Sequence, residues 1–522
     1  MHNESYEIFQ YNSCISRGIC TISPQISALQ TVIVLYLRLF AKYATNINIE
    51  KETKDFILNT ISTTIYNPDF NEDSFRFAVE KFKIELPKLI EKSSNENCNN
   101  LEEEKKKAEE LFNKTSDIIS SIKFGEKVFN RAQENISTEI RDLYNIMLVI
   151  SKSISINLVD LESYEENYEK GFSTVISLLS LINLNEKNVK ILKDKIIEAS
   201  KTDVQLMQLI RECQEKRYGR QRDDEVSYTT VPNKAVLVVG SNIRELEIIL
   251  EKLKNENIDI YTHDEMMLAH TFPKFSEYIH LKGQFGQGVE NCLLDFATFP
   301  GPIILTKHSL HNIENFYRGR LFTTDYISSP KGIIKIENND FTEVIKSAQE
   351  SRGFKRGKNC ETITIGFSFE EIIAKIQNKI STGLFEKIFI IGIDGFSLEQ
   401  KSYFEKLIKL TPENVLILSF SYNIEKNNLV HINTCFDNFS WIRIFDSLKE
   451  YEFSTTIFIP KCDRNTISQM VYLADNKNTE IYIGKCIPIL LNPSLISTLQ
   501  ATFNIHPITS SKNDLAEILK DK

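Results

Sequence analysis

The hydrophobic pattern changes character near the middle of the chain, and this change limits the folds that the chain can adopt. Between residues 23 and 222, apolar residues recur three and four positions apart, as at Leu143, Ile146 and Ile150, which predicts amphipathic helices. After Asn233, short β-branched runs alternate with amphipathic segments. Alternating strands and helices are typical of parallel sheets that carry helices on both faces.

The chain of 522 residues is also too long for one hydrophobic core, because single domains rarely exceed roughly 250 residues. The segment from Lys216 to Asn233 lacks apolar periodicity and indicates a hinge. We therefore predict a helical bundle over residues 1–225, followed by two doubly wound, Rossmann-like α/β domains over residues 226–360 and 361–522. Seven runs have the composition of buried strands: residues 235–239, 258–261, 303–306, 387–391, 415–419, 455–459 and 480–483.

Charge and hydropathy exclude several classes of partner. The chain has 62 Lys and Arg residues against 71 Asp and Glu residues, a formal net charge of −9, whereas nucleic-acid binding depends on clustered positive charge. The most apolar stretch, Ile26 to Ala44, is interrupted by Gln30, Arg38 and Lys42 and predicts a buried helix, not a membrane span. Residues 1–10 do not resemble a secretory signal, so we expect a cytoplasmic protein without a nucleic-acid or membrane partner.

Cysteine usage favours individual roles over a disulfide framework. Nine cysteines is an odd number, and in an intracellular chain they are expected to be buried small apolar side chains or ligands. Cys14 and Cys20 lie close together near the amino terminus. An iron–sulfur cluster of the four-cysteine kind needs four ligands, so Cys14 and Cys20 can hold one only if two more ligands come from elsewhere.

Three further patterns carry weak chemical signals, and each has an ordinary structural explanation. Gly240, directly after the first predicted strand, fits either a nucleotide-binding turn or a plain strand-to-helix turn, and the same two interpretations apply to Gly395. His308, His311 and Glu314 lie three apart and suit a metal if the segment is helical, although most such spacings are accidental. No pattern marks a nucleophile elbow, a P-loop or a zinc-protease helix, so we assign no catalytic residue.

Six stretches occur in a fixed order along the chain. They are CISRGICTISPQISA (Cys14 to Ala28), IDIYTHDEMMLAH (Ile258 to His270), HLKGQFGQG (His280 to Gly288), FATFPGPIILT (Phe296 to Thr306), RLFTTDYISSPKGIIKI (Arg320 to Ile336) and FIIGIDG (Phe389 to Gly395). Together with the region around Cys435, they resemble the hybrid cluster (prismane) protein family, which is related to the nickel carbon monoxide dehydrogenases. The resemblance implies the family's fold of one helical and two α/β domains.

The resemblance also implies two metal clusters where their ligands are retained. In that family, four amino-terminal cysteines hold a cubane [4Fe-4S] cluster. A second, iron–sulfur–oxygen hybrid cluster lies between the domains and reduces hydroxylamine or related N–O substrates. Cys14 and Cys20 match the last two cubane cysteines, but the leading pair is absent from residues 1–11. We therefore do not expect a complete cubane site within one chain.

At the hybrid-cluster site the resemblance places three retained or nearly retained ligands. Glu265 matches the first glutamate ligand and Cys435 matches one of the cysteines, while the last glutamate ligand falls at or near Asp463. Their ordinary interpretation is that of relict residues whose polar contacts still serve the fold.

Four other ligand positions of the hybrid cluster are changed. Ser241 stands where a histidine is expected, and Ser309, Ile393 and Tyr422 stand where cysteines are expected. Iron in such clusters is held by thiolate, imidazole and carboxylate, whereas Ile393 has no lone pair and Tyr422 offers only a phenol oxygen. Because protein interiors tolerate few voids, we expect packed side chains to fill the former cavity.

These changes predict a degenerate homologue that has no hybrid cluster, is not an enzyme, and serves an unknown protein partner as a binding, assembly or structural scaffold.

One alternative is a hydroxylamine-reductase-like oxidoreductase with a rearranged cluster. It would need Glu265, Cys435 and Asp463 as ligands. Further ligands would come from Cys462, Cys486, His308 or His311. Another is a single [4Fe-4S] cluster that Cys14 and Cys20 share between the two subunits of a homodimer. A third, an α/β nucleotide-binding enzyme, rests only on Gly240 and Gly395.

Overall fold

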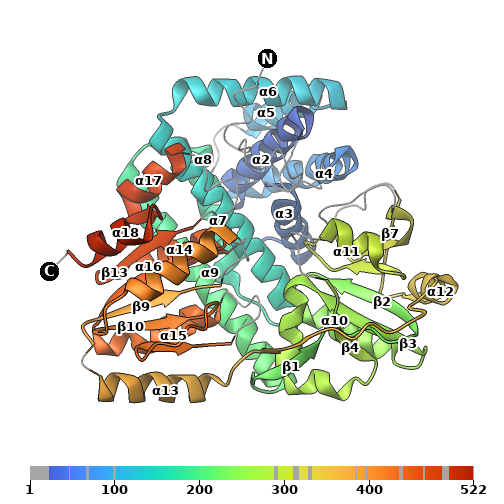
Figure 1. The fold of residues 1–522 in the computed structure, drawn as a ribbon. Coiled ribbons are helices and arrows are strands. Elements are labelled where there is room, and N and C mark those ends of the chain that lie inside the picture. The colour runs from blue at the N-terminus through green and yellow to red at the C-terminus, as the bar shows by residue number, and fades with distance from the viewer. Residues whose placement is uncertain are drawn as a thin grey trace.

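A computed structural model describes most of the chain, and Figure 1 shows its arrangement. The described residues are 23–45, 47–65, 70–97, 101–286, 292–309, 317–326, 332–383, 385–393, 398–433, 439–462, 465–484 and 493–520. Helices form the upper part of the view, and two sheets with flanking helices lie below them, one green to yellow and one orange to red (Figure 1). The predicted order of one helical region and two α/β regions is confirmed.

The helical region begins with a helix whose start is set by its sequence. Ser23 accepts a hydrogen bond from the backbone N–H of Ile26, and Pro24 occupies the first turn, where its missing N–H costs nothing. The helices are α2 (Pro24–Ala44), α3 (Lys51–Thr64), α4 (Glu72–Asn97), α5 (Leu101–Lys114), α6 (Ile118–Asn135), α7 (Thr138–Glu162), α8 (Glu169–Asn183) and α9 (Val189–Tyr218).

Helices α2 and α7 are long and apolar enough to cross a membrane by length and composition alone. Most of each apolar stretch is buried inside the protein, however, and α7 is buried around nearly its whole circumference. A helix that is apolar on all sides is typical of a core position. The predicted buried helix at Ile26 to Ala44 is therefore confirmed.

The first sheet has six parallel strands in the order β4-β3-β2-β5-β6-β7. Its central strand, β2 (Lys234–Val239), has five consecutive buried residues, as a strand covered on both faces requires. The other elements are β3 (Ile258–His263), β4 (Leu281–Gln284), β5 (Ile303–Leu305), β6 (Leu321–Thr323), β7 (Ile333–Lys335), α10 (Ile243–Leu253), α11 (Cys292–Thr298), α12 (Thr342–Glu350) and the 3₁₀ turns η2 (Asp264–Thr271), η3 (Pro273–Glu277) and η5 (Arg318–Arg320).

The second sheet repeats this plan with six parallel strands in the order β11-β10-β9-β12-β13-β14. Its strands are β9 (Lys387–Ile391), β10 (Val415–Ser419), β11 (Leu429–His431), β12 (Ser454–Ile459), β13 (Thr479–Ile483) and β14 (Ile505–Pro507). Its helices are α13 (Phe369–Thr382), α14 (Leu398–Leu410), α15 (Ser440–Leu448), α16 (Thr466–Ala474), α17 (Pro493–Phe503) and α18 (Ser511–Ile518), with the 3₁₀ turn η6 (Lys449–Tyr451).

A small two-stranded ribbon joins the segments before and after the first sheet. Strand β1 (Asp224–Ser227) pairs antiparallel with β8 (Thr362–Ile365), so that Asp224 lies opposite Ile365. The expectation of a hinge without secondary structure from Lys216 to Asn233 is wrong, because the strand partner that orders this segment lies more than a hundred residues away in the sequence. The predicted boundaries at residues 225/226 and 360/361 fall inside or beside the ribbon and stay predictions.

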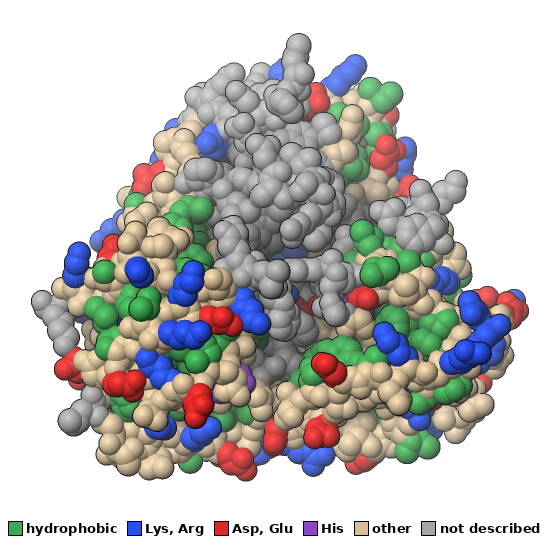
Figure 2. Space-filling view, in the orientation of Figure 1, with side chains coloured by type: hydrophobic (Ala, Val, Ile, Leu, Met, Phe, Trp, Pro, Cys, Tyr) green, Lys and Arg blue, Asp and Glu red, His purple; other side chains and the backbone are tan. Residues whose placement is uncertain are grey.

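The second sheet and the helical region share one hydrophobic core, whereas the first sheet has cores of its own. Polar contacts reinforce the shared core: buried Asp142 of α7 accepts a hydrogen bond from the Thr498 hydroxyl of α17 at 3.0 Å, and Ser153 donates to Asn465 at 2.7 Å. On the face in Figure 2, acidic and basic side chains are interspersed over both α/β regions.

Candidate functional site

The candidate site is built around the carboxyl ends of β2, β5 and β6, where parallel sheets commonly bind ligands. Gly240 directly follows β2 and has a φ of 127°, a backbone conformation that residues with a side chain rarely adopt. A Cβ atom at this position would overlap the hydroxyl oxygens of Thr306 and Ser309. Glycine is therefore required for the close approach of the turn after β5, and this contact explains Gly240 without a bound nucleotide.

Ser309 is fixed in the turn that follows β5. Its backbone N–H donates to the Thr306 carbonyl at 3.1 Å, and the hydroxyls of the two residues are 3.3 Å apart. The Thr306 hydroxyl in turn donates to the Val239 carbonyl at 2.9 Å, which ties β5 to the end of β2. The side chain of Ser309 is buried, so its hydroxyl serves the local turn. The turn that carries Ser241 lies directly against it.

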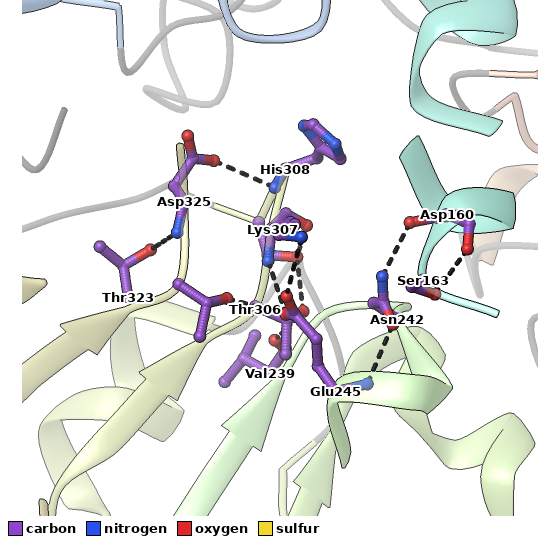
Figure 3. A network of polar contacts seen from close by, with 12 residues as sticks. Asp160, Ser163, Val239, Asn242, Glu245, Thr306, Lys307, His308, Thr323 and Asp325 are labelled. Atoms are coloured by element: carbon purple, nitrogen blue, oxygen red, sulfur yellow. Dashed lines mark hydrogen bonds and ion pairs between the residues drawn. The ribbon is translucent and has the colours of Figure 1, made fainter. Parts of the chain in front are cut away.

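A buried carboxylate, Glu245, connects three of the loops at this sheet end (Figure 3). It accepts hydrogen bonds from the backbone N–H of Lys307 at 3.1 Å and from the Thr324 hydroxyl at 2.8 Å. The Lys307 ammonium is 3.7 Å from the other carboxylate oxygen. Burial raises the pKa of Glu245, while Lys307 and Thr324 oppose that rise. Glu245 thus joins the start of α10 to the turns after β5 and β6.

The same network reaches the helical region through α7 (Figure 3). The side-chain oxygen of Asn242 caps α10 by accepting a hydrogen bond from the backbone N–H of Glu245 at 3.0 Å. The side-chain nitrogen of Asn242 donates a hydrogen bond to Asp160 of α7, also at 3.0 Å. Beside it, the backbone N–H of His308 donates to buried Asp325 at 3.1 Å. His308 has a φ of 62°, which costs about 1–3 kcal/mol at a non-glycine residue and must be held by its surroundings.

Two carboxylates, Asp55 of α3 and Glu162 of α7, form a pair beside this network. The Lys51 ammonium is 2.5 Å from Glu162 at the end of α7, and Glu162 interacts with Asp55 of α3. Burial and the negative charge of Glu162 raise the pKa of Asp55 to about 6, while the positive charges of Lys51 and Lys307 oppose this rise. Asp55 is thus a titrating group near neutral pH at the edge of the network.

This pKa predicts a pH-dependent contribution to stability. Because the folded-state pKa of Asp55 is about 6 and its ordinary value is 3.8, the folded chain binds more protons than the unfolded chain between these values. The contribution of Asp55 therefore falls as the pH rises through this window. Asp55→Asn is expected to raise the thermal unfolding midpoint more at pH ~7 than at pH ~4, measured by circular dichroism. An equal shift at both pH values would contradict the assignment.

Glu265 lies at the start of η2, at the carboxyl end of β3. It is half-buried and follows Asp264, whose φ is 60°. Two histidines near it were not anticipated as site residues: buried His263 pairs with Asp295 at 3.0 Å, and His270 contacts the Thr262 hydroxyl at 2.8 Å. Burial lowers the pKa of His270 to about 4, so this imidazole is neutral at physiological pH.

Ile393 and Tyr422 lie at the carboxyl ends of β9 and β10 in the second sheet. Their turns meet through the Ser421 hydroxyl, which donates to the Gly392 carbonyl at 3.2 Å. Ile393 packs against the shared hydrophobic core, and the buried Tyr422 ring lies 5.5 Å from the Phe404 ring. Tyr422 is thus buried beside an aromatic ring, and Ile393 is partly buried against apolar side chains.

Several of the sequence-predicted site residues fall outside the described residues. These are Cys14, Cys20, Cys435, Asp463, His311, Glu314, Cys486 and Gly395. Cys462 is described, buried and disulfide-bonded, so the expectation that each cysteine is a small apolar group or a ligand is wrong for this one. Within the described ranges, no three His, Cys, Asp or Glu side chains are grouped as a metal site would need.

The comparisons with known proteins assign the class. The model of the Prismane/CO dehydrogenase family matches residues 10–451, so the chain belongs to this family, and the resemblance inferred from its sequence is confirmed.

Its relatives include hydroxylamine reductases that match it from end to end. One from Thermodesulfovibrio yellowstonii is 24% identical over 98% of both chains, and one from Acidiphilium cryptum is 24% identical over 97% of this chain and 96% of the relative. Among solved structures, an acetyl-CoA synthase/carbon monoxide dehydrogenase with NiZn[Fe4S4] and NiNi[Fe4S4] clusters aligns at a TM-score of 0.49 and 11% identity, covering 98% of this chain and 87% of that one.

Proposed function

We propose that this chain is a family member without the hybrid cluster, and that it acts as a non-catalytic binding or assembly scaffold. The observation that carries the proposal is the state of the four changed positions. Ser309 is bonded into its own turn, Tyr422 is packed on an aromatic ring, and Ile393 lies against the shared core. Ser241 belongs to the glycine turn that Ser309 contacts.

The chemistry of these side chains does not fit an iron–sulfur–oxygen cluster. Such clusters need thiolate, imidazole or carboxylate donors, and a hydrocarbon side chain such as Ile393 provides none. A phenol in apolar packing and a serine hydroxyl bonded within its own turn are poor replacements for thiolates.

The network around Glu245 supports the scaffold part of the proposal. It fixes three loops of the first sheet, and Asn242 links them to α7. A rigid connection between the helical region and a sheet suits a protein that presents a fixed surface to a partner. We propose that the partner is another protein.

An activity assay tests the proposal. Purified without oxygen and supplied with reduced viologen dye, this chain is expected to consume no hydroxylamine above the rate of the dye alone. The hydroxylamine reductase of Thermodesulfovibrio yellowstonii, prepared in the same way, is the matched control. Turnover comparable with that of the control would favour the alternative, an oxidoreductase with a rearranged cluster.

A further inference from the structure

A groove with charged residues in its lining lies on the first α/β region, on the exposed face of α10 and away from the strand ends described above. It has a volume of about 470 Å³ and is lined by α10, the last turn of α9 and the η3 turn. Its charged lining residues come from all three elements: Arg217, Arg244, Glu247, Glu251, Lys252 and Lys274. This volume lies within the range of small-molecule sites, roughly 300–1,000 Å³.

Two arginines converge in this groove on one carboxylate. Arg217 donates its Nε to Glu247 at 2.6 Å and its Nη2 at 3.1 Å, while Arg244 donates its Nη1 at 2.6 Å. The Tyr218 hydroxyl also donates to Glu247, at 3.0 Å. Because the Glu247 carboxylate is nearly buried, it holds both guanidinium groups in fixed positions. A single carboxylate neutralises only one of the two charges.

The groove as a whole is positive, although the chain is acidic. Four cationic and two anionic side chains line it, which leaves an excess of two positive charges, against −9 for the whole chain. Glu251 is already engaged by the Tyr278 hydroxyl at 2.8 Å and by Lys254 at 2.8 Å. Each guanidinium keeps further N–H groups beyond those that Glu247 occupies.

We propose that this groove binds a small diphosphate anion, free or esterified. Planar guanidinium groups hold phosphate oxygens through paired hydrogen bonds, and the fixed placement of Arg217 and Arg244 lowers the entropy lost on binding. Lys252 adds charge at the rim, while the Lys274 ammonium is paired with Glu277 at 2.6 Å. This inference does not depend on the proposed function, because the groove contains none of the positions matched to cluster ligands.

Calorimetric titration of the full chain with inorganic pyrophosphate tests the proposal. We expect a dissociation constant below about 1 mM at low salt, weakening as the salt concentration rises. Arg244→Met is expected to weaken binding by about tenfold and the exposed Lys252→Met by about threefold, through loss of one charge each. Lys406→Met, an exposed lysine on α14, is the control and should bind as the unaltered chain does.

Each outcome of the titrations either supports or overturns the diphosphate site. Tighter binding of ADP than of pyrophosphate would support an esterified diphosphate, and equal binding would support recognition of the diphosphate alone. Absence of binding up to about 10 mM pyrophosphate would overturn the proposal. So would equal losses in Lys252→Met and Lys406→Met, because that pattern is typical of unspecific attraction. The circular dichroism spectra of the variants, unchanged from that of the parent chain, show that each has folded.

Discussion

Glu245→Ala is expected to lower the free energy of unfolding by about 3 kcal/mol, because it removes a buried charge that carries two hydrogen bonds and an ion pair. The loss leaves the Lys307 N–H and the Thr324 hydroxyl without their acceptor. Glu245→Gln keeps an acceptor oxygen and is expected to lose less. Denaturant unfolding followed by circular dichroism measures both changes.

The matched control for this prediction is Glu198→Ala on α9. Glu198 is exposed and pairs with Lys195 one turn away at 2.7 Å, an arrangement worth about 0.5 kcal/mol or less. If Glu245→Ala cost no more than Glu198→Ala, the network in Figure 3 would not hold the sheet end together.

Tyr422→Ala is expected to cost about 3–5 kcal/mol, because it removes a buried aromatic ring from a packed cluster that includes Phe404. Tyr422→Phe keeps the ring and is expected to cost about 1 kcal/mol or less. The same denaturant unfolding experiment measures both.

Tyr422→Cys separates packing from metal binding. It restores the cysteine that the family resemblance places here, and it leaves a cavity where the ring was. We expect this variant to be destabilised by about 2–4 kcal/mol and to gain no iron. Iron bound to Tyr422→Cys after anaerobic reconstitution, without loss of stability, would mean that the site still has the room and the remaining ligands for a cluster.

Seven strands of the two sheets were predictable from the sequence, whereas the short strands β4, β6, β7, β11 and β14 were not. All seven predicted runs form strands, namely β2, β3, β5, β9, β10, β12 and β13, because long β-branched runs suit burial on both faces. Strands such as β7 and β14 have only three residues each, too few to show a periodic pattern. The β1–β8 ribbon depends on a partner distant in sequence, which local composition does not reveal.

At the candidate site, sequence reasoning pointed to the positions but not to the contacts that their side chains make. Ser309 and Tyr422 were anticipated through the family resemblance. Glu245 was missed because it lies in the first turn of an amphipathic helix, where a carboxylate normally faces solvent. The spacing of Asn242 and Glu245 is that of a capping box, which would turn the carboxylate back on the helix start. Its actual partners come from the turns after β5 and β6, so only the folded sheet reveals them.

The central claim, that this chain holds no hybrid cluster, is tested most directly by iron and acid-labile sulfide content with an absorption spectrum, on protein purified without oxygen. The claim predicts a colourless, iron-free chain, while the Thermodesulfovibrio yellowstonii relative serves as the reference preparation. About two iron atoms per chain would indicate a [4Fe-4S] cluster that Cys14 and Cys20 of two chains share in a homodimer, which is compatible with the absence of the hybrid cluster. About four or more iron atoms per chain would contradict it.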